Sequence, residues 1–395
     1  MIHIIERIII YRKQAGSTRS SIVCLQPESV HEKERTTMST NENLMQMYYA
    51  MQPDALRRTA DEGETLLEGI RKALKGLQIQ KVFLLGIGSS FHSARLAEHA
   101  FRELSGLPVE SVTPETADVR IKEMNRQTLV IAISQSGTSS NTLSAVKRIK
   151  SQQASPVFTV TQGLSSPIAA ESDAIIPLCI PDEKAGPKTM GVIATVCSLL
   201  LIAAAIRGDT DACTALLSDF RAEADAMEAN VPAARDWALS LKDTLAAESA
   251  WMVVGQRAAF APAGECALKL IETVRRIVTC MELEEAVHGP AASFIAHPAL
   301  MVLHLPWDDA VRPEALCGLC EARSGHAYRI GLDKNAPSAQ GKSITLQYAC
   351  PRLAILELLL PAQAVSAWIA PLMGIDLDKH DSDSFSRILA GHLDE

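Results

Sequence analysis

The chain has 395 residues, which is too long for one ordinary domain and fits two domains of average size. Hydrophobic residues make up 47% of the sequence and charged residues 21%, so the chain can build buried cores and shows no sign of global disorder. The net charge is −8 and no Lys/Arg cluster is interleaved with aromatic residues, which argues against binding of nucleic acid.

Apolar and cysteine patterns narrow the class of protein further. The longest strongly apolar stretch, residues 192–206, is shorter than the roughly 20 residues of a membrane span, and it predicts a buried helix. The nine cysteines are scattered, as is typical of reduced thiols in a cytoplasmic protein. Cys317 and Cys320 have metal or redox spacing, but no further ligands at matching spacing stand out, so we interpret them as helix cysteines. We expect no membrane span, no metal and no cofactor.

The first half of the chain alternates between predicted strands and helices. Residues 1–43 lack clear periodicity and contain a second methionine, Met38, so we interpret them as an extension that is disordered or reflects a misassigned start. Helical spacing of apolar residues predicts one or two helices from Leu44 to Leu77. Alternation follows, which is typical of a doubly wound parallel sheet. The strands are expected at 81–90, 107–117, 128–140, 155–163 and 172–180, with helices at 91–106 and 141–152.

The second half repeats this pattern after a helical bridge rich in Ala, Asp and Glu at 207–248. Strands are expected at 248–256, 299–307 and 327–333, helices at 261–276 and 312–325, a strand–loop–helix unit at 279–295, and a final apolar helix. We therefore predict an α/β protein of two tandem domains. The predicted boundaries are 44–210 for the first domain, 211–247 for the bridge, 248–375 for the second domain and 376–395 for a tail.

Two predicted strands of the first domain end in turns rich in Gly and Ser, GIGSS at 86–90 and SQSGTSS at 134–140. Ligands of doubly wound sheets bind beyond the carboxyl ends of the strands, where helix N-termini offer free N–H groups. One such cluster is usually a capping turn, but two on one sheet favour a phosphate site with several hydroxyl donors. Neither a dinucleotide fingerprint nor a P-loop is present, which disfavours ATP chemistry.

These turns resemble those of the SIS (sugar isomerase) family, which includes the isomerase half of glucosamine-6-phosphate synthase (a glutamine–fructose-6-phosphate aminotransferase) and the phosphosugar deglycases. The resemblance implies two flavodoxin-like SIS domains in which the SQSG stretch and the GSS turn wrap a sugar phosphate. By position, it assigns the phosphate to Ser90, Ser134, Gln135, Ser136 and Ser139. The family's Gly-Glu-Thr is here Gly-Thr-Ser, which keeps the last hydroxyl.

The second domain carries further motifs of this family. ECALKLIE at 265–272 resembles the ALKLKE helix of the synthase, and EEAVHGP at 284–290 resembles its loop ending in His-Gly-Pro. Glu272 and His288 are as far apart in sequence as the family's catalytic pair. A histidine exchanges protons near neutral pH and suits ring opening, whereas a carboxylate suits proton transfer between C1 and C2. Lys269 would stabilise developing negative charge or pair with Glu272. The alternatives are a solvated glutamate and a capping histidine.

Departures from the synthase limit what the resemblance implies. Ile2 stands where a glutaminase domain would have its nucleophilic cysteine, Ile271 replaces the second lysine of the helix, and Gly391 takes the place of the lysine that forms a Schiff base. Transfer of nitrogen from glutamine is therefore not expected.

A loop between the predicted fifth strand and the apolar helix, EKAGPKTMG at 183–191, resembles a Gly-Pro-Lys-Thr loop of deglycase-like relatives. Lys188 and Thr189 are therefore candidate substrate contacts, with a charged surface loop as the alternative.

The leading hypothesis is an enzyme that cleaves the C–N bond of a fructosamine-type 6-phosphate. Alternatives are aldose–ketose isomerisation, an aminotransferase-like isomerase, and deamination of glucosamine 6-phosphate, all without a glutaminase domain. A regulator that senses sugar phosphates is a different class. It would need the phosphate ligands and usually a DNA-binding domain, and residues 1–60 show no convincing helix-turn-helix. The family's histidine reaches across a subunit interface, so the resemblance implies a homodimer with composite sites.

Overall fold

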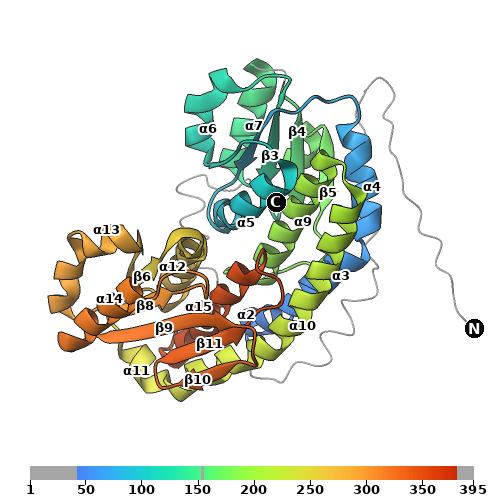
Figure 1. Cartoon of the computed structure of the whole chain (residues 1–395). Helices are drawn as coiled ribbons and strands as arrows, with labels where there is room; N and C mark the ends of the chain where they lie inside the picture. Colours follow the sequence, from blue (N-terminus) through green and yellow to red (C-terminus); the bar gives the residue numbers. More distant parts are fainter. Residues whose placement is uncertain (1–41, 153–154, 380–395) are drawn as a thin grey trace, which may run out of the picture.

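The computed structural model describes residues 42–152 and 155–379, so the interpretations of Met38, of Gly391 and of most of the two terminal segments lie outside the described residues. Its first half is built on a five-stranded parallel sheet of order β2-β1-β3-β4-β5 (Figure 1). This is the order of a flavodoxin-like sheet. The strands are β1 (Lys81–Leu85), β2 (Val109–Val112), β3 (Thr128–Ile133), β4 (Val157–Thr161) and β5 (Ala174–Pro177).

Helices cover both faces of this sheet because alternate side chains of each strand point to opposite faces. On β1, Val82 and Leu84 belong to an inner core, whereas Phe83 and Leu85 belong to an outer one. The inner helices are α3 (Gln52–Asp61), α4 (Gly63–Leu74), α5 (Ser89–Ser105) and α9 (Met190–Arg207). The outer helices are α6 (Pro114–Arg120), α7 (Ser140–Gln152) and α8 (Pro167–Glu171).

The second sheet has the order β10-β11-β9-β8-β6-β7. Without the antiparallel edge strand β10, its strands follow the same order as those of the first sheet. The strands are β6 (Ala250–Gly255), β7 (Ile277–Glu282), β8 (Ala299–Leu303), β9 (His326–Asp333), β10 (Ser338–Gln340) and β11 (Ser343–Gln347). The predicted pair of doubly wound sheets is therefore confirmed. Strands β10 and β11 were missed because they are short and polar.

One continuous core joins the two halves. It lies between the sheets and includes residues of α5 and α9 from the first half and of α12 (Phe260–Val274) from the second. The 31-residue helix α10 (Thr210–Ser240) packs against α3 as well as β11 (Figure 1). Helix α9 and the stretch Ala354–Leu372 are apolar and long enough to span a membrane, but they are 89% and 78% buried inside the protein. Such extensive burial is typical of helices in a protein core.

Three predicted elements differ in the structure. Residues 44–77 form three helices, α2 (Leu44–Ala50), α3 and α4, rather than one or two, with Pro53 in the first turn of α3. The strand predicted at 107–117 ends at Val112, because Thr113 caps α6 and Pro114 starts it. The final apolar helix is divided into η5 (Ala354–Leu359), α15 (Leu360–Ala364), the π-helical η6 (Val365–Ile369) and α16 (Ala370–Leu372).

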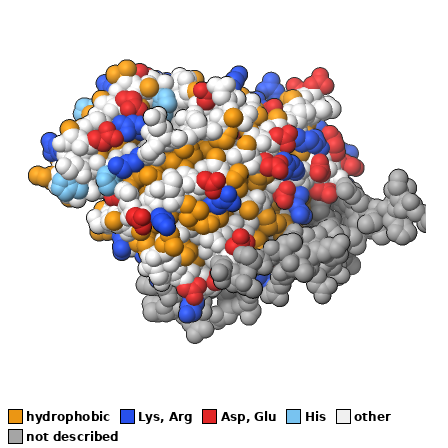
Figure 2. Space-filling view, turned by 90° about the horizontal axis from the view of Figure 1, so that it is seen from below, with side chains coloured by type: hydrophobic (Ala, Val, Ile, Leu, Met, Phe, Trp, Pro, Cys, Tyr) orange, Lys and Arg blue, Asp and Glu red, His pale blue; other side chains and the backbone are white. Residues whose placement is uncertain are grey.

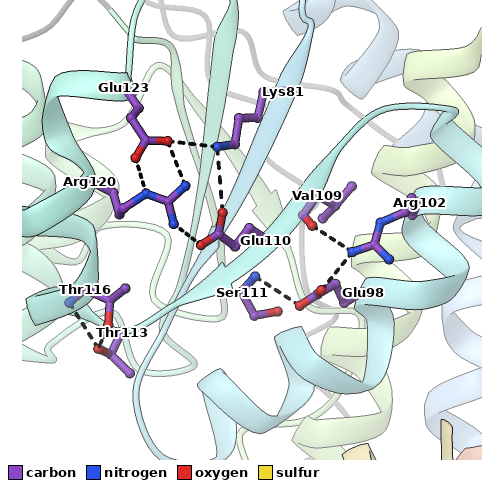
Figure 3. Close-up of polar contacts among 10 residues, drawn as sticks. All are labelled: Lys81, Glu98, Arg102, Val109, Glu110, Ser111, Thr113, Thr116, Arg120 and Glu123. Atoms are coloured by element: carbon purple, nitrogen blue, oxygen red, sulfur yellow. Dashed lines mark hydrogen bonds and ion pairs between the residues drawn. The ribbon is translucent and has the colours of Figure 1, made fainter. Parts of the chain in front are cut away.

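An ion-pair network covers the edge of the first sheet beside β2 (Figure 3). Arg120, at the end of α6, contacts Glu110 on β2 and Glu123. Lys81 lies 3.2 Å from Glu123 and 3.7 Å from Glu110. Hydrogen bonds to Arg120 and Lys81 lower the pKa of Glu123 to about 2. Exposed pairs of this kind add little stability, but charges at an edge strand discourage pairing with another chain.

Two buried carboxyl groups meet where α10 packs against η5 and the residues just before it. Glu223 accepts hydrogen bonds from the backbone N–H groups of Ala349 (3.1 Å) and Cys350 (2.7 Å). Glu357 accepts one from the Asn230 amide at 2.7 Å. Burial raises the pKa of Glu223 to about 7, and burial together with the neighbouring Glu223 raises the pKa of Glu357 well above its ordinary value. The pair is therefore protonated more readily in the folded protein than in the unfolded chain.

This pair should make stability fall as pH rises. Between the ordinary pKa of 4.5 and about 7, the folded protein keeps a proton that the unfolded chain releases, so each step up in pH favours unfolding. Glu357→Gln keeps the shape of the protonated group, and we expect it to be more stable than the wild type at pH 8 and similar at pH 5. Urea unfolding at both pH values measures this. Equal effects at the two pH values would contradict it.

Candidate active site

The two Gly/Ser-rich turns lie side by side because β1 and β3 are hydrogen-bonded neighbours. The order of the sheet reverses between these strands, and ligands bind doubly wound sheets at such a switch point. Ser90 lies in the first turn of α5, a helix that begins directly after Gly88, and the φ of +58° at Gly88 favours glycine. A Cβ on Gly86 would lie 2.8 Å from the backbone of Ser90, so only glycine allows this turn.

The turn after β3 is tightly built. Gly137 has a φ of +75°, and a Cβ there would lie 2.0 Å from Ser166 Oγ. Ser134 is buried, whereas Ser136 is exposed and its hydroxyl lies 2.8 Å from Thr138 Oγ1. The Ser139 hydroxyl is buried and lies 3.1 Å from Thr142 Oγ1 in the first turn of α7. Three of the four serines expected at the phosphate, Ser134, Ser136 and Ser139, thus share this turn, and Ser139 also bonds within the protein.

The Gln135 side chain faces the protein rather than solvent. Its amide donates hydrogen bonds to Gln162 Oε1 at 2.9 Å and to Glu183 Oε2 at 3.2 Å. Its backbone carbonyl accepts from Gln162 N at 2.8 Å and from Thr161 Oγ1 at 3.1 Å. Gln162 after β4 and Glu183 after β5 therefore fix the position of the Gln135 side chain. The family resemblance had assigned Gln135 only to phosphate binding.

Helix α12 brings the predicted lysine and glutamate together. Lys269 Nζ lies 2.6 Å from Glu272 Oε2 and 3.4 Å from Glu265 Oε1. The Lys269 side chain is 1% exposed, that of Glu265 is fully buried, and that of Glu272 is 38% exposed. Burial acts to lower the pKa of Lys269, but the two carboxylates outweigh it and raise the pKa above its ordinary value. Lys269 is therefore a fixed positive charge beside a solvent-accessible carboxylate.

Glu265 is a site residue that the sequence analysis missed. It joins the two halves, because the Ser89 hydroxyl of α5 donates a hydrogen bond to its Oε1 at 3.1 Å. Burial raises the pKa of Glu265 to about 7, although Lys269 acts to lower it. Its Oε2 has no hydrogen-bond partner within the described part of the chain. A buried carboxyl with a pKa near neutrality can hold or release a proton at working pH.

The two histidines of this region differ in their surroundings. His288 is exposed at the end of α13 (Leu283–Val287), and no hydrogen bond or ion pair between the described residues joins it to Glu272. His92 lies on α5 against Gly264, where a Cβ would lie 2.8 Å from its ring. Burial, together with Lys269 and Arg95, lowers the pKa of His92 to about 4, so it is neutral at physiological pH. His92 is not among the site residues predicted from the sequence.

The loop after β5 is ordered around Glu183. The Lys188 ammonium donates to the Glu183 carbonyl at 2.6 Å, and the Thr189 hydroxyl donates to Glu183 Oε1 at 3.0 Å. Thr189 is fully buried and Lys188 is half-buried, which does not fit the alternative of a charged surface loop. Burial lowers the pKa of Lys188, and the charges of Lys269 and Glu272 also act on it. The loop is therefore within electrostatic range of the charged residues of α12.

The CGLC pair is part of the core. Cys317 and Cys320 are buried on α14 (Val311–Ala322), as the interpretation of two helix cysteines predicted. In residues 42–152 and 155–379, no group of three or more His, Cys, Asp or Glu side chains is placed to hold a metal ion.

Two flavodoxin-like sheets, the first with serine-rich turns at its switch point, define a two-sheet α/β protein. Residues 77–206 match the family model of the SIS domain, so the resemblance to this family is confirmed. The chain is 29% identical over 352 residues to a glutamine–fructose-6-phosphate aminotransferase (isomerizing) of Mycolicibacterium smegmatis, a match over 84% of this chain and 55% of that protein. This chain thus spans about half the length of the curated relatives it matches.

Solved structures support the same fold. A structure from Salmonella typhimurium LT2, provisionally described as a sugar-binding protein, is 26% identical with a TM-score of 0.73 and covers 83% of this chain and 100% of its own. The C-terminal domain of glucosamine-fructose-6-phosphate aminotransferase from Francisella tularensis is 18% identical, with a TM-score of 0.65 over 87% of this chain and 100% of its own. At this lower identity the second likeness concerns the fold alone.

Proposed function

We propose that the protein is a cytoplasmic enzyme that processes a phosphorylated sugar or amino sugar. In its most specific form, it cleaves the C–N bond of a fructosamine-type 6-phosphate. The observation that carries this proposal is the cluster of Glu265, Lys269 and Glu272 on α12, which is bonded through Ser89 to the turn after β1. Acid–base groups thus adjoin the turns expected to bind phosphate. A regulator that only senses sugar phosphates has no need of such a cluster.

In this proposal Ser90, Ser134 and Ser136 bind the phosphate with hydroxyl donors. Glu272, half-exposed and paired with Lys269, transfers the proton between C1 and C2, and His288 opens the sugar ring. Lys188 contacts the substrate from the loop after β5. Isomerisation and deamination use the same groups. They remain alternatives because curated relatives of the chain, at 24–29% identity, are isomerizing aminotransferases.

The substrate panel that tests this consists of fructosamine 6-phosphates, glucosamine 6-phosphate and fructose 6-phosphate. Each is incubated with the purified chain, and both released amine and isomerised sugar are measured. We expect amine and a hexose phosphate from the fructosamine 6-phosphates. Release of ammonia only from glucosamine 6-phosphate would favour the deaminase. Binding of these compounds without any turnover would favour a regulator and contradict the proposal.

We further propose a homodimer in which His288 of each protomer completes the site of the other. Strand β7 lies at the edge of its sheet, and Ile277 on it is 77% exposed. The strand runs directly into α13, whose C-cap is His288. A second copy of the chain packed against this edge would bring its own His288 toward the site of the first protomer. The space-filling view also shows hydrophobic side chains gathered in a band on the face seen from below (Figure 2). Light scattering should report a dimer.

Mixed dimers test the shared site. Glu272→Gln and His288→Asn should each be inactive alone, because each removes one half of every site. After the two are unfolded and refolded together, half of the dimers are mixed and each has one intact site, so about a quarter of wild-type activity should return. No recovery, with dimers present, would place both residues in the same protomer's site. An active monomer would also contradict the proposal.

A further inference from the structure

The Glu183 carboxylate accepts four hydrogen bonds although it is only 2% exposed. Its Oε1 accepts from the N–H of Thr189 at 2.7 Å and from the hydroxyl of the same residue at 3.0 Å. Its Oε2 accepts from Gly191 N at 2.8 Å and from Gln135 Nε2 at 3.2 Å. In all four bonds the Glu183 oxygens are the acceptors. An ionised carboxylate is the side chain that offers two oxygens that act only as acceptors.

These bonds join segments that are far apart in sequence. Gln135 belongs to the turn after β3, whereas Thr189 and Gly191 begin the buried helix α9. The backbone carbonyl of Glu183 also accepts from Lys188 Nζ at 2.6 Å. One residue therefore bonds both to the turn expected to hold the phosphate and to Lys188, a lysine on whose pKa the charges of Lys269 and Glu272 act.

Close packing fixes this arrangement. A Cβ on Gly191 would lie 2.3 Å from Gln135 Oε1, so glycine is what lets the Gln135 amide reach Glu183. The amide is held from its other side by Gln162, whose own side chain donates to the carbonyls of Ile180 and Pro181. The Gln135 side chain thus has one position, set by its neighbours.

We propose that Glu183 is a positioning residue that holds Gln135 and Lys188 in the geometry required by the phosphosugar. This inference rests on the proposed function. Its carboxylate acts on the phosphate end through Gln135, and its carbonyl acts on the carbonyl end through Lys188. The competing explanation is that Glu183 only caps the N-terminus of α9, which would affect stability and leave substrate binding unchanged.

Glu183→Gln keeps the size of the side chain but places an NH₂ group against donors, so two hydrogen bonds are lost. We expect the Kd for fructose 6-phosphate, measured by calorimetry, to rise at least about tenfold, since bonds to charged groups are the stronger kind. In the active enzyme KM should rise more than kcat falls. The effect should overlap with that of Lys188→Met. The rise in Kd of the double variant should therefore be smaller than the product of the two single rises.

Two further variants separate positioning from capping. Asp209→Ala removes the side-chain cap of α10, where Asp209 Oδ1 accepts from Ala212 N at 3.1 Å, and should lower Tm without changing the Kd. Gly191→Ala leaves Glu183 intact and improves helix propensity, but its Cβ displaces the Gln135 amide. Gly191→Ala should raise the Kd for fructose 6-phosphate. It therefore tests the positioning role even if Glu183→Gln does not fold.

The outcomes are distinct. A wild-type protein that binds no phosphosugar of the panel overturns the proposed function, and the positioning role with it. A wild type that binds, together with folded Glu183→Gln and Gly191→Ala variants that bind equally well, overturns the positioning role alone and leaves Glu183 as a cap of α9. A rise in Kd for Glu183→Gln and Gly191→Ala, with the Kd of Asp209→Ala unchanged, supports the positioning role.

Discussion

Glu272→Gln is expected to bind fructose 6-phosphate about as tightly as the wild type, while kcat falls at least about 100-fold. The reason is that an amide of the same shape cannot accept or return a proton. The carboxylate is 38% exposed and paired with Lys269 at 2.6 Å, so it is accessible to a substrate and held in place. Calorimetry and a turnover assay on the best substrate of the panel measure the two effects separately.

The matched control is Glu68→Gln, on the exposed face of α4. It removes the same charge from the chain without touching the cluster on α12, and it should leave both binding and kcat unchanged. Folding of Glu272→Gln should be nearly normal, because Lys269 keeps its second carboxylate partner, Glu265. Retention of most of the turnover by Glu272→Gln would show that another group moves the proton.

Lys269→Met should reduce the free energy of unfolding by about 3–5 kcal/mol, the usual range when one partner of a buried ion pair is removed. Lys269 is buried between two carboxylates, and without it Glu265 is left with only the Ser89 hydroxyl. The exposed Lys147→Met on α7 is the control and should have little effect. Urea unfolding measures both.

The loss in Lys269→Met should depend on pH. Lys269 acts to lower the pKa of Glu265, so its removal raises that pKa further above the present value of about 7. The folded variant then binds a proton that the unfolded chain releases above about 4.5, and stability falls as pH rises from there. We therefore expect a larger deficit at pH 8 than at pH 5. Adding Glu265→Gln should recover most of the loss. Equal deficits at both pH values would contradict this account.

The Gly/Ser-rich turns could be found in the sequence because their signals are local. Gly86 and Gly137 are required by backbone approach and by a positive φ, and the serines follow strands whose apolar runs are easy to recognise. Glu272 and Lys269 were found because both stand on one helix, three residues apart, where side chains are neighbours. Resemblance to a family then supplied their roles.

Glu265 and Glu183 begin motifs that the sequence shows, and His92 follows the first Gly/Ser-rich turn, but their contacts were not recognised because no local pattern shows what these side chains meet in the fold. Glu265 matters because α12 packs against α5 and buries its carboxyl beside Ser89. Glu183 bonds to Gln135 because β3 and β5 flank β4 in the first sheet and their carboxyl ends lie at the same edge. His92 is neutral because the packing against Gly264 desolvates it.

The sequence alone determined that this is an α/β protein with two similar sheets, because the spacing of apolar residues encodes which faces are buried. It also determined where small hydrogen-bonding residues end the strands. Only the tertiary structure decided which charged groups share a site and which protonation states they adopt. Burial and the distances between segments far apart in the chain set these properties, and neither is written in local sequence.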